Sequence, residues 1–202
     1  MEYMDLPCKF SEKGCKQVGV RSTMQAHVKQ CKFREVECPR WPCEEMVTYG
    51  EVVDHLKNAH GTTRETINER SVMWSLNQQQ QHKTHVPILS FYHGRTFIFN
   101  CMKRDHITML WVTVLGTEEE AKTFDVEMTA GPCCHMQTRM RGKVYSIEKS
   151  KEEVLQDPHG ILEISNNMAG KMGVMEEGEP WLHVECDIMK EGNDYSDESE
   201  SD

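Results

Sequence analysis

The feature that most constrains this fold is an ordered series of cysteines and histidines between residues 8 and 60. The first half reads Cys-x6-Cys-x11-His-x3-Cys, and the second, six residues later, reads Cys-x4-Cys-x11-His-x4-His. Each half offers four thiolate or imidazole ligands, which is what a tetrahedral zinc site takes. Incidental cysteines are the alternative, but chance would have to place the eleven-residue gap twice. The predicted metal ligands are Cys8, Cys15, His27, Cys31, Cys38, Cys43, His55 and His60.

Local signals place the histidines on short helices. Ser22 with Gln25, and Thr48 with Glu51, have capping-box spacing, so each pair predicts a helix start just before a histidine. In the first half the histidine and the last cysteine are four residues apart and share a helix face. The two histidines of the second half are five residues apart, so the end of their helix is expected to tighten or unwind.

Three of the ligand cysteines in the first half are followed directly by a lysine, namely Lys9, Lys16 and Lys32. Three thiolates on a divalent zinc leave this site formally at −1, whereas the second site is neutral. We interpret the lysines as charges that screen the extra thiolate, with coincidence as the alternative.

Charge and composition exclude several classes of protein. Of the formal net charge of −10, six negative charges lie within residues 191–202, and the zinc region as a whole is balanced. This argues against nucleic acid, because its binders present a basic face. No apolar run approaches the roughly 20 residues of a membrane span, and the N-terminus does not resemble a signal peptide.

Cysteine usage indicates a reducing compartment, so the expected location is cytoplasmic and/or nuclear. The total of nine cysteines is odd. The four cysteines outside the array have no histidines at the spacings of the two ligand sets, and we expect them to be small buried hydrophobic residues. These are Cys101, Cys133, Cys134 and Cys186.

From residue 86 the apolar pattern changes to the period of two that is typical of strands. Strands are predicted over residues 86–92, 95–102, 107–115, 124–128, 134–140, 144–147, 161–164 and 181–189, with one helix over 150–156. The predicted fold class is α+β but mainly β, with two small zinc fingers followed by an antiparallel β-sandwich. The predicted domains are the fingers at 1–61, a connector at 62–85, the sandwich at 86–190 and an acidic disordered tail at 191–202.

The doubled ligand series followed by this β pattern resembles the substrate-binding region of the seven-in-absentia ubiquitin ligases. The similarity extends to WVTVLGT at 111–117, AKTF at 121–124 and VYSI at 144–147. The resemblance implies SIAH-type zinc fingers joined to a TRAF-like sandwich, homodimers, and recognition of proteins marked for ubiquitination. The family places a RING domain before the fingers. Here Cys8 is the first cysteine, so we expect no RING and no ligase activity from this chain by itself.

Three functions remain open on the sequence. The favoured one is a RING-less adaptor or competitor in ubiquitin-dependent degradation, which binds client proteins or forms a heterodimer with a RING-bearing relative. The second is a fragment or isoform of a complete ligase, and the third is a nucleic-acid-binding zinc-finger protein. A zinc hydrolase is disfavoured, because a catalytic zinc keeps one position open whereas both sites here have four protein ligands.

Residues 86–92 are the expected binding site for an extended client peptide. They form an apolar strand that contains Pro87, and a proline suits the edge of a sheet, where a peptide can add as an extra strand. In the acidic tail, Ser199 precedes Asp202 by three residues and is a predicted phosphorylation site. The predicted peptide contacts are Val86, Ile88, Leu89, Ser90 and Tyr92.

Overall fold

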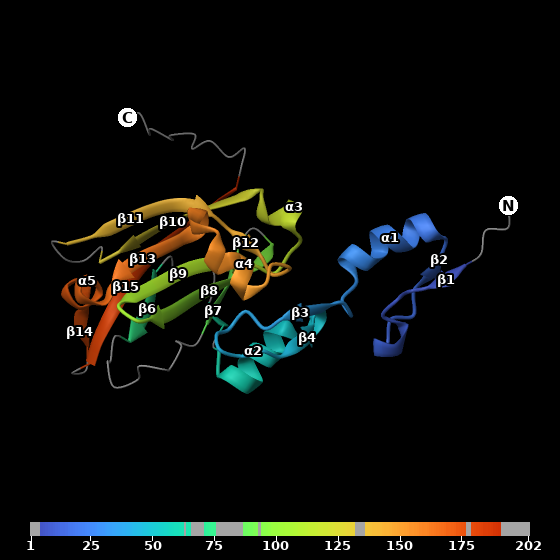
Figure 1. Ribbon diagram of the computed structural model, residues 1–202, viewed down its shortest axis with the longest axis horizontal. Coiled ribbons are helices and arrows are strands. Elements are labelled where there is room, and N and C mark those ends of the chain that lie inside the picture. Colours follow the sequence, from blue (N-terminus) through green and yellow to red (C-terminus); the bar gives the residue numbers. More distant parts are fainter. Residues whose placement is uncertain are drawn as a thin grey trace, which may run out of the picture.

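The structure is a computed structural model of the 202-residue chain (Figure 1). It describes residues 5–62, 64–65, 71–75, 87–92, 94–131, 136–176 and 179–190. Val86, Cys133, Cys134 and the whole predicted tail, including Ser199, lie outside these residues. No helix in the described part of the chain is long and apolar enough to cross a membrane.

The first finger comprises residues 5–34 and has a small cluster of its own. It contains β1 (Leu6–Pro7), the 3-10 helix η1 (Ser11–Lys13), β2 (Val18–Gly19) and α1 (Arg21–Gln30). Strands β1 and β2 form an antiparallel pair. Its cluster joins three ligand cysteines to Met24, with Phe10, Val28 and Phe33 packed around them. No described residue of the sandwich belongs to this cluster.

The second finger comprises residues 35–61 and repeats this plan with a longer hairpin. It contains β3 (Glu35–Glu37), β4 (Met46–Thr48), the 3-10 helix η2 (Tyr49–Glu51) and α2 (Val52–His60). Strands β3 and β4 pair in antiparallel fashion. Both fingers therefore carry a histidine-bearing helix behind a small hairpin, as the spacing predicts.

Two sheets form the rest of the chain. The first has the order β12-β9-β8-β7-β5, with β13 also paired to β9, and the second has the order β11-β10-β15-β14, with β6 also paired to β15. All pairs are antiparallel except β12 with β9 and β5 with β7. The first sheet comprises β5 (Arg64–Glu65), β7 (Ile88–Tyr92), β8 (Arg95–Arg104), β9 (Ile107–Val114), β12 (Tyr145–Ser146) and β13 (Ile161–Ser165). The second comprises β6 (Ser71–Ser75), β10 (Phe124–Ala130), β11 (Thr138–Lys143), β14 (Val174–Glu176) and β15 (Glu179–Lys190).

The apolar core lies between these sheets. Alternate residues of β8 and β9 face alternate residues of β10 and β15, and the rings of Phe97 and Phe124 meet edge to face at 5.2 Å. Cys101 and Cys186 belong to this core, where burial raises the pKa of each thiol. Both are thus buried small hydrophobic residues, as predicted. The mainly β fold, with zinc-finger modules ahead of two sandwiched sheets, is confirmed.

Several elements were not predicted from sequence. Strands β5 and β6 fall within the stretch expected to be a connector, and β6 pairs with β15 in the second sheet. The predicted helix is present as α4 (Lys151–Gln156) and precedes the 3-10 helix η4 (Pro158–Gly160). Two further helices are α3 (Glu118–Ala121) and α5 (Asn166–Met172). Thr117 and Glu120 form a complete capping box at the start of α3, so the sequence does contain a start signal for this helix.

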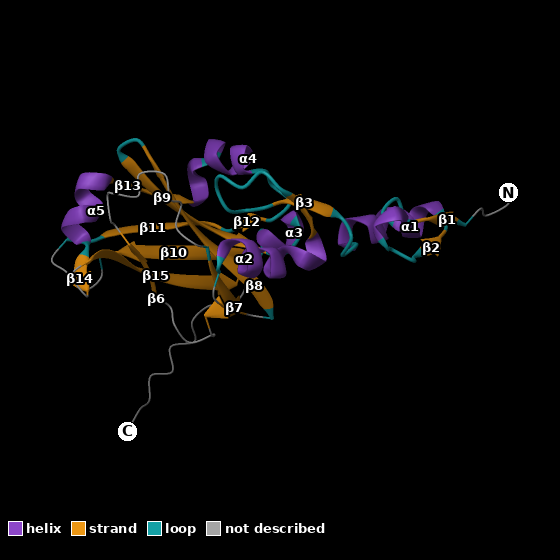
Figure 2. Cartoon of the chain, turned by 90° about the horizontal axis from the view of Figure 1, so that it is seen from below, coloured by secondary structure: helices purple, strands orange, loops and turns teal. Residues whose placement is uncertain are grey.

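The second finger packs against the outer face of the first sheet. Val52 and Leu56 of α2 are fully buried and share one cluster with Leu89 of β7 and Ile98 of β8. In Figure 2, α2 lies beside β8, whereas α1 and β1 extend away toward the N-terminus. The sandwich therefore has a core between its sheets and a second apolar contact outside, under the second finger.

Candidate metal centres

The first ligand set is assembled from three local elements. Cys8 follows β1, Cys15 follows the turn of η1, His27 lies on α1, and Cys31 ends that helix. The Sγ atoms of Cys8 and Cys31 are 4.0 Å apart, and Cys15 Sγ lies 3.3 Å from His27 Nε2. All four ligand atoms lie within 4.8 Å of one another.

The second set is assembled in the same way. Cys38 follows β3, Cys43 lies in the turn before β4, and both histidines come from α2. Cys38 Sγ is 3.4 Å from His60 Nε2, and Cys43 Sγ is 3.7 Å from His55 Nε2. The two Nε2 atoms are 3.1 Å apart. The structure thus brings together all eight predicted ligands in the two predicted groups.

These separations fit tetrahedral zinc. Zn–S bonds of about 2.3 Å and Zn–N bonds of about 2.0 Å imply edges of about 3.8 Å between two sulfurs, about 3.5 Å between sulfur and nitrogen, and about 3.3 Å between two nitrogens. Each of the five separations above agrees with its edge within about 0.2 Å. Both donor sets are suited to zinc, and each fills all four positions of the ion, so both are structural sites.

Helix α2 ends at the second of its two ligand histidines. The N–H of Gly61 donates to the carbonyls of both Leu56 and Lys57, and Gly61 has a positive φ of 66°. The N–H of Thr62 also donates to the carbonyl of Leu56 at 3.1 Å, so this cap closes the helix directly after His60. Helix α2 runs through His60, so whether its end tightens or unwinds on zinc binding stays a prediction. Glycine suits the position because its left-handed conformation is costly for other residues.

The capping-box predictions for both finger helices are wrong. Helix α1 begins at Arg21 after Val20, with no side-chain cap, and Ser22 lies within its first turn. Thr48 precedes η2 rather than α2, and its hydroxyl donates to the Glu51 carboxylate instead of forming reciprocal backbone bonds. Spacing indicated the right helices but not their first residues.

The surroundings favour the metal-binding form of some ligands and oppose it at two buried cysteines. Glu45 lies 3.4 Å from His55 Nδ1 and can orient that ring. Burial and the charge of Arg40 lower the pKa of His60, which keeps its imidazole neutral. The backbone N–H of Gln17 lowers the pKa of Cys15 to about 7. Burial raises the pKa of Cys31 to about 11 and of Cys38 to about 12, so zinc must displace their protons on binding.

The lysines beside the ligand cysteines contact aromatic rings. Lys9 Nζ lies 4.8 Å from the centre of the Phe10 ring, and Lys32 Nζ lies 5.2 Å from that of Phe33. The sulfur of Cys8 instead accepts from the backbone N–H of Phe10 at 3.5 Å. Screening of the thiolates by these lysines therefore stays a prediction.

Three polar side chains that the sequence did not single out tie the second finger to the sandwich. Lys151 of α4 is buried, forms an ion pair with Glu37 at 2.8 Å and donates to the carbonyl of Cys43. The hydroxyl of Tyr49 donates to the carbonyl of Leu115 at 2.9 Å. Nothing in the local sequence distinguishes these residues from surface polar residues, because their partners are distant in the chain.

Arg34 connects the two fingers and the sandwich. Its guanidinium lies 3.5 Å from the centre of the Tyr49 ring, and its Nη1 donates to the carbonyl of Cys31 at 3.2 Å. Its Nε lies 3.4 Å from the carboxylate of Glu148. One buried cation thus contacts a backbone group of the first metal site, the second finger and the turn after β12.

The structure places the predicted peptide contacts unevenly. Ile88 belongs to the core between the sheets, and Leu89 belongs to the cluster under the second finger, so neither side chain is exposed. Ser90 and Tyr92 are half-buried, and β5 pairs with β7 at Leu89 and Ser90. Peptide binding at this edge stays a prediction, and of the predicted contacts that the structure describes only Ser90 and Tyr92 have partly exposed side chains.

The charge balance of the zinc region hides two opposite halves. Residues 5–34 contain seven lysines and arginines against two acidic residues, a difference of +5. Residues 35–61 contain two basic and six acidic residues, a difference of −4. The first finger is therefore a basic module in an acidic chain, which the summed charge of the region did not reveal.

Comparison with known sequences agrees with the metal geometry. Residues 1–74 match the family described as "Sina, zinc finger". The chain is 26% identical over 200 residues to the E3 ubiquitin-protein ligases SINAT5 and SINAT2 of Arabidopsis thaliana, covering 94% of this chain and 63% and 64% of theirs. It is 24% identical over 198 residues to the E3 ubiquitin-protein ligase DIS1 of Oryza sativa subsp. japonica, covering 93% of this chain and 64% of that protein. The chain thus spans just under two thirds of the length of these relatives.

Proposed function

Because this chain is a relative of the seven-in-absentia ubiquitin ligases, with a Sina zinc finger over residues 1–74, we propose that it recognises client proteins in ubiquitin-dependent degradation. The observation that carries the proposal is that both metal sites are closed. Four protein ligands at each ion leave no position for a reacting water, so zinc here maintains a surface rather than performs chemistry.

We propose further that these 202 residues act without a RING, as an adaptor or as a competitor of a complete ligase. A RING is itself a Cys/His zinc domain. The two clusters use five of the nine cysteines, and among the described remainder Cys101 and Cys186 are buried singly in the sandwich core. The chain would then deliver clients by pairing with a RING-bearing relative in the cytoplasm or nucleus, or would occupy clients unproductively.

Reconstituted ubiquitination tests this role. With ubiquitin-activating and conjugating enzymes supplied, we expect no ubiquitin chains from this protein alone. When a RING-bearing relative and a client are added, we expect client modification to rise for an adaptor and to fall for a competitor. Robust autoubiquitination of the isolated chain would contradict the proposal. So would a rate of client modification by the RING-bearing relative that is the same with and without this chain.

We propose β7 as the client-binding edge, with an extended peptide taking the place of β5. Strand β5 pairs with only two residues of β7, and so short a strand is held by few hydrogen bonds. Tyr92→Ser should weaken client binding, whereas Met175→Ser, at a position 71% exposed on the other sheet, should not. Binding that survives Tyr92→Ser at unchanged zinc content and melting temperature would exclude this edge.

A further inference from the structure

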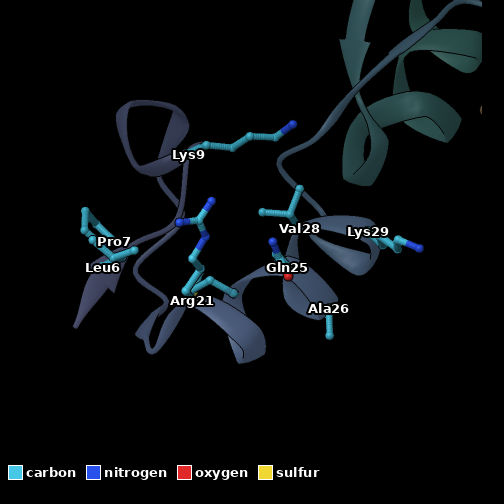
Figure 3. Close-up of a pocket in the computed structure, with 9 residues that line it drawn as sticks. Leu6, Pro7, Lys9, Arg21, Gln25, Ala26, Val28 and Lys29 are labelled. Carbon is cyan, nitrogen blue, oxygen red and sulfur yellow. The ribbon is translucent and has the colours of Figure 1, made fainter. Parts of the chain in front are cut away.

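The first finger carries a groove that the metal sites do not explain. It lies between β1 and α1 and has a volume of about 780 Å³. Figure 3 shows Leu6 and Pro7 on one side and Val28 on the other, with Arg21 between them and Lys9 along one end. Lys29 borders the groove but points away from it.

The floor of this groove is apolar and accessible. Leu6 is 38% exposed, Pro7 is exposed, and Val28 is half-buried above the buried side chain of Met24. These residues belong to a finger whose own cluster is small, and no described residue of the sandwich covers them. An apolar surface of this kind gains free energy when a partner covers it.

The rim of the groove is basic. Lys9, Arg21 and Lys29 are exposed, and none forms an ion pair with any residue that the structure describes. The zinc site beneath has a formal charge of −1, which still leaves the first finger at about +4 once zinc is bound. The neighbouring finger has the opposite sign, so a negatively charged partner is attracted to the first finger and repelled from the second.

We propose that this groove binds an acidic amphipathic peptide segment of a partner protein, in which apolar side chains alternate with aspartate or glutamate. The apolar side chains would cover Leu6, Pro7 and Val28, and the carboxylates would pair with Lys9 and Arg21. The phosphates of a nucleic acid would pair with the basic side chains of the rim but would leave the apolar floor exposed to water. The acidic C-terminal segment of this chain has the right charge, but Tyr195 is its only large apolar residue.

This groove is separate from the β7 edge, and the proposal does not depend on a role in ubiquitination. It lies on the finger that extends away from the sandwich, whereas β7 contacts the second finger (Figure 1). Two binding surfaces on separate parts of the molecule would let the chain hold a partner at the first finger while a client occupies the sandwich.

Fluorescence anisotropy on the full-length, zinc-loaded chain tests the proposal. The probe is a short labelled peptide in which glutamate alternates with leucine, and its control has lysine in place of glutamate. We expect the first peptide to bind and the second not to bind. Lys9→Glu with Arg21→Glu should weaken binding about tenfold or more, because both reverse a charge at the rim.

The matched control is Lys16→Glu with Lys32→Glu, which makes the same charge change on the same finger but outside this groove. We expect it to weaken binding less than about threefold, with zinc content measured for every variant. Val28→Asp should also abolish binding, since it places a charge on the apolar floor. Equal losses in the two charge-reversal variants would overturn the groove as the site.

Two further outcomes identify other occupants and would overturn the proposal. The first is a single-stranded oligonucleotide that binds more tightly than the acidic peptide. The second is a gain of about tenfold in peptide affinity when residues 1–4 or 191–202 are removed, which would make the occupant a segment of this chain. Absence of any binding by the acidic peptide would equally exclude the proposed partner chemistry.

Discussion

The two zinc fingers have similar ligand spacing and opposite surroundings. In the first finger the ligand cysteines and Met24 form a cluster that involves no described residue of the sandwich. In the second, Cys38 lies in one cluster with Val52, Leu56, Leu89 and Ile98, so its metal site is continuous with the outer face of a sheet. The same arrangement of hairpin, helix and four ligands therefore forms an independent module in the first finger and a structural part of the sandwich in the second. This difference indicates that zinc stabilises different amounts of structure in the two fingers.

The largest test of this difference removes one ligand from each finger. Cys38→Ser should release one zinc and expose Leu89 and Ile98, because metal binding supplies folding free energy on the order of 10 kcal/mol. We expect a clear fall in the melting temperature of the sandwich, with native mass showing one remaining ion. Cys15→Ser should also release one ion but leave the sandwich transition unchanged. Equal melting temperatures for the two variants would remove the distinction between the fingers.

Core substitutions test the same difference without touching a ligand. Leu56 is fully buried under the second finger, and Leu56→Ala should lower the free energy of unfolding of the sandwich by about 2–5 kcal/mol. Met24→Ala is the counterpart in the first finger, and it should weaken zinc retention there without shifting the sandwich transition. Chemical denaturation followed by tryptophan fluorescence measures the first effect, and chelator-dependent zinc release measures the second.

Two lysine–glutamate pairs sharpen the comparison further. Lys151 pairs with Glu37 at the second finger, where the side chains are 6% and 21% exposed. Lys151→Met should cost about 1–3 kcal/mol because it leaves a half-buried carboxylate and the Cys43 carbonyl without this donor. Lys13 of the first finger pairs with Glu35 at the start of the second, where both side chains are about 40% exposed, and Lys13→Met should cost less than about 0.5 kcal/mol. If the double variant Glu37→Gln with Lys151→Met is no more stable than Lys151→Met alone, the unpaired Glu37 carboxylate is not the source of the lost stability.

At Arg34, which lies between the fingers, we expect a smaller effect than at the ligands, at Leu56 or at Lys151. Arg34→Lys keeps the charge but loses the planar contact with Tyr49, so we expect a cost of about 1 kcal/mol. A clearer result of Arg34→Lys should be a broader range of angles between the first finger and the rest of the molecule. Residual dipolar couplings of the two parts, compared with those of the unchanged chain, measure that range. An unchanged alignment would show that Arg34 does not orient the first finger.

Residues close in sequence determined the metal sites. The spacings from Cys8 to His60 predicted all eight ligands, because each short hairpin and helix brings its own ligands together. The period of two in β8, β9, β10 and β15 predicted the strands, because alternate side chains of a strand face opposite sides. The helix starts were predicted wrongly, since α1 begins one residue before Ser22 and the η2 turn separates Thr48 from α2.

Only the tertiary structure decided what covers each apolar face. Alternation shows that Leu89 and Ile98 lie on one side of the first sheet, but their partners on α2 are more than thirty residues away, and no local pattern connects them. The same holds for Lys151, which is a surface-like residue in a short helix until Glu37 and the Cys43 carbonyl meet it. Ligand chemistry can be predicted from sequence because its geometry is local and its residue types are few. The docking of one folded module on another cannot, because it depends on the summed shape and charge of two surfaces.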